Sequence, residues 1–272
     1  RSTLMRSSAA SDVYKRQPKI MVSDGPHGLR KQDENGDNPG VNDSIKAVCF
    51  PAGCGAATSF NRDLIYEMGK SLGKECQSEN VSVLLGPAVN IKRSPLCGRN
   101  FEYYSEDPYL ASEIAASHIN GVQSMGVGTS IKHFMANNQE TRRMSVSASI
   151  DERALHEIYL AVFENAIKKS KPWTVMSSYN KVNGRYVGEN HELMTDFLRK
   201  ESGFDGFVMS DWGAVGNRVA GVKAGLDLEM PGSQGVRDAL IVEAVKNGSM
   251  EESTLNTACE RILNIVYKAV EN

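Results

Sequence analysis

Short apolar runs alternate along the chain with longer segments of mixed polarity. The apolar runs predict buried strands at 20–22, 81–85, 128–132, 173–177, 207–210 and 226–230. The segments between them carry apolar residues at the spacing of one helix face, which predicts helices at 61–79, 108–125, 151–170, 190–201, 214–223, 234–247 and 251–270. Strands that alternate with helices are typical of βα units around a parallel sheet.

Two helix starts carry a local signal. Asp107 is a suitable N-cap, and Pro108 after it suits the first helical position. Ser149 and Glu152 have the spacing of a capping box, which predicts the start of the helix at 151–170. That helix is expected to bury one face made of Leu155, Ile158, Tyr159, Val162 and Ile167.

Polar and charged residues cluster directly after each predicted strand. A (β/α)8 barrel places its active site at this end of its strands. The chain shows six clear strands, so we expect an α/β TIM-like barrel that is incomplete. The polar loop at 31–48 is long enough to form part of its rim. No GxGxxG motif follows the first strand, so a dinucleotide site is not indicated.

The composition excludes several classes of function. The chain has 272 residues and a net charge of −2, which gives no reason to expect a nucleic-acid or membrane partner. Five scattered cysteines form no CxxC pair, which favours reduced thiols and a cytoplasmic protein. No spacing of His, Cys or carboxylates suggests a metal site, and no cofactor is expected. Residues 1–17 lack a clear period and are interpreted as a non-native, adapter-derived tail.

The segment 206–212 carries the sharpest chemical signal. Its apolar run ends in Asp211 and Trp212, a carboxylate beside a flat apolar ring. Sugar rings have apolar faces and polar rims, so this pair suits a sugar site. Asp211 is therefore a candidate nucleophile of a retaining glycosidase. The alternative is that Asp211 only caps a segment that begins at Gly213.

Other strand ends carry groups that suit a ligand rich in hydroxyls. Guanidinium and ammonium groups donate hydrogen bonds, carboxylates accept them, and aromatic rings stack. The candidates are Asp24, Arg30, Arg99, Lys132, His133, Tyr179 and Trp212. Each has a structural alternative. Asp24 could stabilise a Gly-Pro turn, Arg99 and Glu102 could form a surface ion pair, and Lys132 with His133 could be a solvated strand end.

Several long motifs resemble glycoside hydrolase family 3, in its bacterial β-glucosidase branch. In chain order they are SDGPHGLRKQ, FPAG, LLGPAVNIKRSPLCGRNFEYYSEDP, SIKHFMANNQETRR, VMSSYNKVNG, GFVMSDWGA and GLDLEMPG, within 18–272. The resemblance implies that Asp211 is the nucleophile and that Asp24 grips the sugar hydroxyls. It also implies that Arg30, Arg99, Lys132 and His133 line the glycone pocket, that Tyr179 lies beside the nucleophile, and that Trp212 separates the glycone and aglycone sites.

The resemblance also implies a missing part. Retaining hydrolysis needs a second carboxyl group as acid/base. In the β-glucosidase branch a C-terminal α/β sandwich domain supplies it, and 18–272 would be the catalytic barrel domain alone. The other branch carries a KHFPGHG-type motif where this chain has KHFMANNQETRR. We therefore expect a truncated β-glucosidase without its proton donor, whose partners are a β-glucoside and the missing domain.

Three alternatives stay open from the sequence. A β-xylosidase of the same family differs only in how the site treats one hydroxymethyl group. A non-catalytic sugar-binding barrel would use Asp211 solely as a hydrogen-bond acceptor. A Schiff-base lyase would use Lys132, which is placed at a strand end, as its nucleophile.

Overall fold

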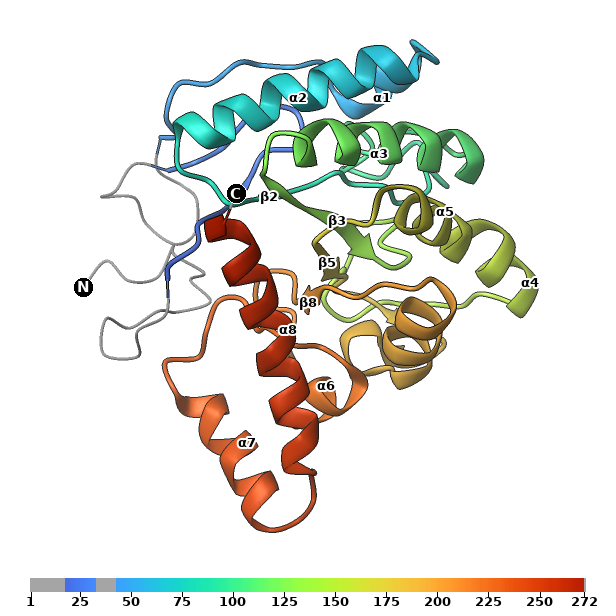
Figure 1. Ribbon diagram of the computed structural model, residues 1–272. Helices are drawn as coiled ribbons and strands as arrows, with labels where there is room; N and C mark the ends of the chain where they lie inside the picture. Colours follow the sequence, from blue (N-terminus) through green and yellow to red (C-terminus); the bar gives the residue numbers. More distant parts are fainter. Residues whose placement is uncertain (1–17, 33–42, 272) are drawn as a thin grey trace.

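The computed structural model describes residues 18–32 and 43–271, and a five-stranded parallel sheet forms its centre (Figure 1). The strands lie side by side in chain order: β1 (Val22–Asp24), β2 (Val83–Leu85), β3 (Gly128–Phe134), β5 (Thr174–Ser177) and β8 (Phe207–Met209). Every neighbouring pair is parallel. All five strands therefore end at the same edge of the sheet, where polar residues follow them in the sequence.

The sixth predicted strand, at 226–230, forms only a bridge with the sheet. Leu228 pairs in parallel with Met209, and the backbone N–H groups of Asp227 and Leu228 donate to the carbonyl of Val208. The expected α/β barrel is thus present as an incomplete, open arrangement within the described residues. The predicted tail at 1–17 lies outside them, and so does the larger part of the predicted rim loop at 31–48.

Helices cover both faces of the sheet. One apolar cluster joins Ile131, Val175 and Val208 of the strands to α3 (Pro108–Gln123), α5 (Ala161–Ser170) and η4 (Glu192–Glu201). On the opposite face, α8 (Glu252–Glu271) contributes Ile265 to a cluster with Phe207 and Met209. Successive strand residues face opposite sides, which is why Val208 belongs to one cluster and its neighbours to the other.

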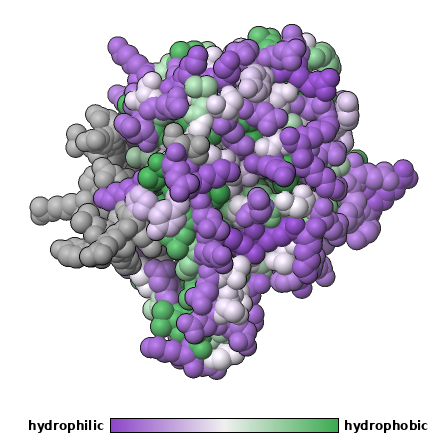
Figure 2. All heavy atoms as spheres, viewed as in Figure 1, coloured by the Kyte–Doolittle hydropathy of each residue, from purple (hydrophilic) through white to green (hydrophobic). Residues whose placement is uncertain are grey.

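The remaining elements surround this core. They are α1 (Gly53–Ala57), α2 (Arg62–Ser78), α4 (Glu152–Ala154), η2 (Leu155–Leu160), η3 (Val187–Glu189), α6 (Arg218–Ala224), α7 (Val236–Lys246) and a small sheet of β4 (Ser147–Ala148), β6 (Lys181–Val182) and β7 (Arg185–Tyr186). Helices α2 and α3 lie side by side (Figure 1) because glycines let them approach: a Cβ at Gly121 would lie 2.2 Å from the carbonyl oxygen of Tyr66. Figure 2 shows apolar surface at the lower end, around α7, which exposes Val236 and Leu240.

The structure confirms one predicted helix start and corrects another. Asp107 caps α3, since its carboxylate accepts hydrogen bonds from the N–H groups of Tyr109 and Leu110. The capping box at Ser149 was wrong, because Asp151 is the N-cap of α4 and accepts from the N–H of Ala154. Asp151 lies directly before the first helical residue, so its short side chain satisfies that N–H without help from Ser149.

One predicted core residue is also wrong. Ile158 is 37% exposed, whereas Leu155, Tyr159, Val162 and Ile167 are buried as predicted. The segment Leu155–Leu160 is a π-helix, whose turns are wider than those of an α-helix. The extra width rotates Ile158 away from the face that regular α-helical spacing would give it.

The described residues include neither a membrane-spanning helix nor a cluster of metal-binding side chains. None of the helices in 18–32 and 43–271 is long and apolar enough to cross a membrane. The same part of the chain holds no group of three or more His, Cys, Asp or Glu side chains that could bind a metal ion.

Candidate active site

The turn after β1 presents Asp24 at the strand end. Asp24 closes the turn with its backbone, because its carbonyl accepts from the N–H of Arg30 at 2.9 Å. Gly25 is required here: its φ is +133°, and a Cβ would lie 2.2 Å from the carbonyl oxygen of Gly28. The turn alternative for Asp24 therefore applies to its backbone, while its carboxylate is left to contact another strand.

Lys132 of β3 forms an ion pair with that carboxylate. Its Nζ lies 2.6 Å from Asp24 Oδ1, and the Lys132 side chain is only 4% exposed. Burial is the largest influence on the pKa of Asp24 and acts to raise it, but Lys132, the N–H of Gly25 and Arg99 together hold this pKa below its usual range. Lys132 is therefore a buried cation with a defined partner, which rejects the solvated strand end as an explanation.

Lys132 and His133 are adjacent, yet both reach the candidate site. Adjacent residues of a regular strand would point to opposite faces. The register between β3 and β5 shifts between Ile131 and Phe134, so the strand is irregular at this point. Such irregularities re-aim side chains near functional sites, and here the shift places an ammonium and an imidazole on the same ligand-facing edge.

Arg99 and Glu102 form a buried ion pair, which corrects the surface alternative. Arg99 Nε lies 2.5 Å from Glu102 Oε1, and Glu102 is 4% exposed. The second end of the guanidinium contacts His133, with 2.6 Å between Arg99 Nη2 and His133 Nε2. Two of the nitrogens of Arg99 are thus held in place, and its Nη1 lies 3.8 Å from Asp211 Oδ2.

Asp211 follows β8 and is 8% exposed. Its Oδ1 accepts the N–H of Trp212 at 2.7 Å, while its Oδ2 is buried without a hydrogen-bond partner. No helix begins at Gly213, because α6 starts at Arg218 with Asn217 as its N-cap. The capping alternative for Asp211 is therefore wrong, and one of its carboxylate oxygens stays available for chemistry.

Burial dominates the electrostatics of Asp211. Burial raises the pKa of this carboxyl above its usual range, although the positive charges of Arg99 and Lys132 act to lower it. Burial also lowers the pKa of His133 far below its usual range, and Arg99 adds to that effect. His133 is therefore neutral, so its 3.6 Å approach to Asp211 Oδ2 is not an ion pair.

Tyr179 and Trp212 form the wall beside Asp211. The hydroxyl of Tyr179 donates to the carbonyl of Trp212 at 3.0 Å, which connects the ends of β5 and β8. The Arg143 guanidinium lies over the Tyr179 ring, 4.5 Å from its centre. Trp212 is 38% exposed, so its indole presents an open apolar surface at this wall.

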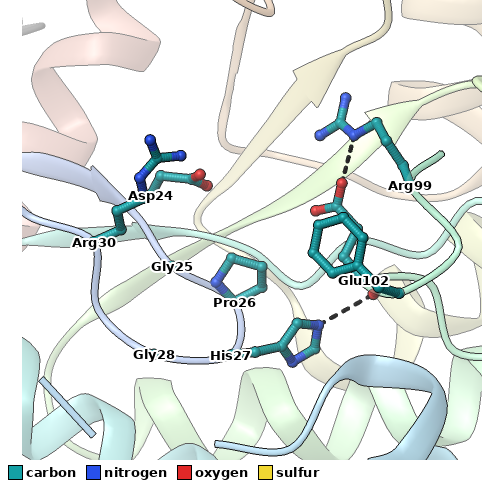
Figure 3. Close-up of a pocket in the computed structure, with 9 residues that line it drawn as sticks. Asp24, Gly25, Pro26, His27, Gly28, Arg30, Arg99 and Glu102 are labelled. Carbon is teal, nitrogen blue, oxygen red and sulfur yellow. Dashed lines mark hydrogen bonds and ion pairs between the residues drawn. The ribbon is translucent and has the colours of Figure 1, made fainter. Parts of the chain in front are cut away.

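A cavity of about 330 Å³ lies between the first two strand-end loops. Figure 3 shows Asp24 and Arg30 on one side of it and Arg99 and Glu102 on the other. Its lining consists of Asp24, Gly25, Pro26, His27, Gly28, Arg30, Arg99, Phe101 and Glu102. Thus three predicted site residues line the cavity. The other five lie outside this lining, and the Lys132–Asp24 and Arg99–Asp211 contacts connect Lys132 and Asp211 to it.

Three residues of this network were not predicted from the sequence. Glu102 was considered only as half of a possible surface ion pair with Arg99, and Arg143 lies in the motif SIKHFMANNQETRR without a predicted role. Asn90, which follows β2, contacts both the backbone and the ring of His133. The signal for Asn90 was its position in the segment that follows a predicted strand, whereas nothing local distinguishes Arg143 from Arg142 beside it.

Comparison with known proteins identifies the family. Residues 31–265 match the family described as "Glycosyl hydrolase family 3 N terminal domain". The chain belongs to glycoside hydrolase family 3. It is 61% identical over 255 residues to thermostable beta-glucosidase B of Acetivibrio thermocellus, covering 94% of this chain and 34% of that protein. It is 51% identical over 252 residues to an exo-alpha-(1->6)-L-arabinopyranosidase of Bifidobacterium longum, covering 92% of this chain and 33% of that protein.

Solved structures of the family support the barrel assignment. Beta-glucosidase 3B of Thermotoga neapolitana in complex with alpha-D-glucose superimposes with a TM-score of 0.89 at 46% identity, covering 96% of this chain and 37% of that one. Beta-glucosidase of Kluyveromyces marxianus in complex with glucose superimposes with a TM-score of 0.92 at 36% identity, covering 99% of this chain and 32% of that one. The chain therefore has the TIM-like fold of the family 3 N-terminal domain, and it spans about a third of the length of the relatives it matches.

Proposed function

We propose that this chain carries the nucleophile and the glycone pocket of a retaining β-glucosidase. The observation that carries the proposal is the state of Asp211. One of its oxygens is fixed by the backbone, and the other is buried without a hydrogen bond, at ion-pair distance (3.8 Å) from a guanidinium nitrogen of Arg99. A buried carboxylate oxygen without a partner is costly to keep, which suggests that it is retained for reaction with a substrate.

In the proposed reaction Asp211 Oδ2 attacks the anomeric carbon of the glucoside. The bond from this carbon to the leaving oxygen breaks as an ester bond to Asp211 forms. Water then hydrolyses the glycosyl ester and returns the carboxylate, with net retention at the anomeric carbon. The hydrogen bond from Trp212 to Oδ1 orients the carboxylate, which leaves Oδ2 as the attacking atom.

The surrounding groups suit the hydroxyls and the faces of a sugar ring. Asp24 is half-exposed toward the cavity and would accept hydrogen bonds, while Lys132 and Arg99 would donate them. Arg30 lines the same cavity. His133 contacts Arg99 through its ring nitrogen Nε2 and would hold this guanidinium beside the sugar. Tyr179 and Trp212 would supply the aromatic wall. Two relatives of this chain were solved in complex with glucose, which supports a sugar as the ligand.

The proton donor is not apparent among the described residues. A general acid needs a raised pKa, whereas Lys132 lowers the pKa of Asp24. Glu102 is held by Arg99 at 2.5 Å and cannot protonate a leaving group without breaking that pair. We infer that another part of the parent protein supplies the acid/base. The relatives support this view, because this chain spans only 34% of the first of them.

Mechanism-based labelling tests the proposal. A 2-deoxy-2-fluoro-β-glucoside with an activated leaving group needs little acid assistance and should add one glycosyl group, detected by intact-mass spectrometry. The label should disappear in Asp211→Asn and persist in Asp63→Asn, which changes an exposed aspartate on α2. A folded wild-type chain that binds glucose but gains no mass would instead support the sugar-binding alternative.

Matched substrates address the specificity. The same labelling with fluorinated β-xylosyl and α-L-arabinopyranosyl reagents separates glucosidase from xylosidase activity. It also tests the arabinopyranoside specificity named for the Bifidobacterium longum relative. We expect the β-glucosyl reagent to react fastest. The Schiff-base alternative is disfavoured because the ammonium of Lys132 is paired with Asp24, and borohydride trapping of a carbonyl substrate should leave Lys132 unmodified.

A further inference from the structure

Asn90 contacts His133 through three hydrogen bonds. Its Oδ1 accepts the backbone N–H of His133 at 3.0 Å and lies 3.3 Å from the ring Nδ1. Its Nδ2 donates to the backbone carbonyl of His133 at 2.9 Å. Asn90 is 2% exposed and His133 is 1% exposed, so water does not compete for these contacts.

These contacts determine which ring nitrogen of His133 carries the proton. A backbone N–H can only donate and a carbonyl can only accept, so the orientation of the Asn90 amide is fixed. The oxygen of that amide then faces Nδ1, which must carry a hydrogen to bond with it. In a neutral imidazole the other nitrogen, Nε2, is therefore an acceptor. Arg99 Nη2, an obligate donor, lies 2.6 Å from it, in agreement with this assignment.

The charges around His133 keep the ring neutral. Burial lowers its pKa most, and Arg99, Lys132 and Arg143 lower it further. The negative group that faces the ring, Asp211, lies 3.6 Å from Nε2. The edge of the Tyr103 ring packs against the imidazole, with 6.3 Å between the ring centres. Among the residues that the structure describes, the acceptor at Nδ1 is the amide oxygen of Asn90.

The neutral ring in turn positions Arg99. The guanidinium of Arg99 is held at Nε by Glu102 and at Nη2 by His133. These two contacts direct its Nη1 toward Asp211 Oδ2, the oxygen without a hydrogen bond. We propose that Asn90 is a positioning residue, which fixes His133 as an acceptor and thereby sets the Arg99 charge against Asp211. This proposal rests on the nucleophilic role of Asp211, whereas the protonation state of His133 can be tested without it.

An Asn90→Asp variant tests the proposal with little change in shape. The carboxylate would still accept from Nδ1, but it would repel the His133 carbonyl and favour a doubly protonated ring. Nε2 would then carry a hydrogen and repel Arg99. The matched control is Asn183→Asp. Asn183 holds Ile150 through the same pair of backbone contacts, both at 2.9 Å, but faces no imidazole.

Two measurements on the full chain give independent readouts. The first is ¹⁵N–¹H correlation of the histidine rings, with the His133 signals assigned by their loss in His133→Gln. We expect the Nδ1–H form of His133 in the wild type, unchanged across neutral pH and in Asn183→Asp, and a protonated Nε2 in Asn90→Asp. The second is the rate of fluoroglucoside labelling, which Asn90→Asp should slow by about 10- to 100-fold and Asn183→Asp should leave unchanged.

The outcomes separate the two proposals. An Nε2–H form of His133 in the wild type, or its titration near neutral pH, would overturn the positioning role even if Asp211 is labelled. Equal labelling rates in Asn90→Asp and Asn183→Asp would overturn it as well. The expected ring signals without labelling of the wild type would retain the Asn90–His133 assignment and reject the nucleophile. If Asn90→Asp does not fold, the wild-type ring signals still decide.

Discussion

The individual residues of this site balance burial against charge. Asp211 is buried and its pKa is raised, while Arg99 acts in the opposite direction. A nucleophile benefits from both effects, because a poorly solvated carboxylate is reactive and a nearby cation keeps it ionised. The same balance appears at Asp24, where Lys132, Gly25 and Arg99 together prevail over burial and the pKa falls. The pKa values of these two carboxyl groups, which lie at one edge of the sheet, are therefore shifted in opposite directions.

Replacing Arg99 should change the pH dependence of labelling. The nucleophile reacts when deprotonated, so the rate falls as the pH drops through the pKa of Asp211. In Arg99→Met burial is less opposed, which raises this pKa further and moves the acid limb to higher pH. We also expect a slower maximal rate, by about 100-fold. Arg153→Met, which removes an exposed arginine, is the control. An acid limb that stays in place or moves to lower pH contradicts this account.

Removing the carboxylate of Asp24 should lower stability in a pH-dependent way. A lowered folded-state pKa adds stability that is full above the usual Asp pKa of about 4 and is lost as the pH falls through the folded value. Asp24→Asn should therefore cost about 1–2 kcal/mol at neutral pH, less than a fully buried pair because the side chain is 45% exposed. Urea unfolding at neutral and acidic pH measures the difference, which should shrink in acid. A cost independent of pH would show that the ion pair is not its source.

At the scale of elements, the helix after Asp151 shows where sequence periodicity fails. The face predicted from the sequence included both Ile158 and Ile167, yet Ile158 is 37% exposed and Ile167 is 1% exposed. In a regular α-helix of 3.6 residues per turn these two positions lie on opposite sides. The π-helical turn at Leu155–Leu160 lies between the cap and the regular part of the helix. Leu155 and Tyr159 within this turn and Ile167 after it are buried, whereas Ile158 is not.

Alanine variants of Ile158 and Ile167 test this difference in burial directly. Ile167→Ala should reduce the free energy of unfolding by about 2–5 kcal/mol, since it leaves a cavity in the core. Ile158→Ala should cost less than about 1 kcal/mol, because the side chain is partly exposed and alanine favours helix. Urea denaturation of both variants gives the comparison. Similar losses in the two variants would contradict the difference in burial between Ile158 and Ile167.

Asp227 connects three elements beneath the site. One oxygen of its carboxylate accepts from the N–H of Val208 in β8 at 2.8 Å and lies 2.6 Å from Arg199 of η4. The other oxygen lies 3.2 Å from Arg261 of α8. Burial raises the pKa of Asp227 and lowers that of Arg199, so the pair is retained by its hydrogen bonds in a costly environment.

Loss of this carboxylate should destabilise the fold. Asp227→Ala leaves the 8% exposed side chain of Arg199 without its partner, at a cost of about 3–5 kcal/mol. Glu157→Ala breaks an exposed ion pair with Arg153 and should cost less than about 1 kcal/mol. Thermal unfolding of the two variants checks the contrast. A loss in Asp227→Ala no larger than in Glu157→Ala would mean that α8 and η4 are held by apolar packing alone.

At the scale of the whole molecule, the described residues form an open α/β arrangement. Its sheet has five parallel strands and one bridged segment, and the chain spans about a third of its relatives. The groups we propose for glycone binding and nucleophilic attack come from all five strand ends or the loops after them. The proposed proton donor is the one part of the mechanism that these strand ends do not provide.

The dependence of the hydrolysis rate on the leaving group tests whether this chain supplies a proton donor. The acidic phenol of an aryl β-glucoside can leave as a phenolate without protonation. The leaving glucose of cellobiose would depart as an alkoxide and therefore needs a proton. We expect the chain to turn over the aryl substrate slowly and cellobiose at least about 100-fold more slowly still. Steady-state assays with both substrates measure this, and Asp211→Asn should abolish the remaining activity. Robust cellobiose hydrolysis by this chain would show that the acid/base lies within it.

The sequence by itself determined the order of strands and helices, the parallel sheet and the candidate residues. Local signals suffice for these features, because burial periodicity and strand-end position are properties of neighbouring residues, as at Asp107 and Asp211. The long family motifs added roles that spacing alone could not assign.

Only the tertiary structure decided how these residues act on one another. Asn90 and His133 are separated by 43 residues and Lys132 and Asp24 by 108, so no local pattern reveals their contacts. The same holds for burial: Glu102 is enclosed, and Ile158 is exposed, only because of what packs around them. The pKa of Asp211 depends on that enclosure, since desolvation is set by the whole fold and a charge pair by atoms a few ångströms apart.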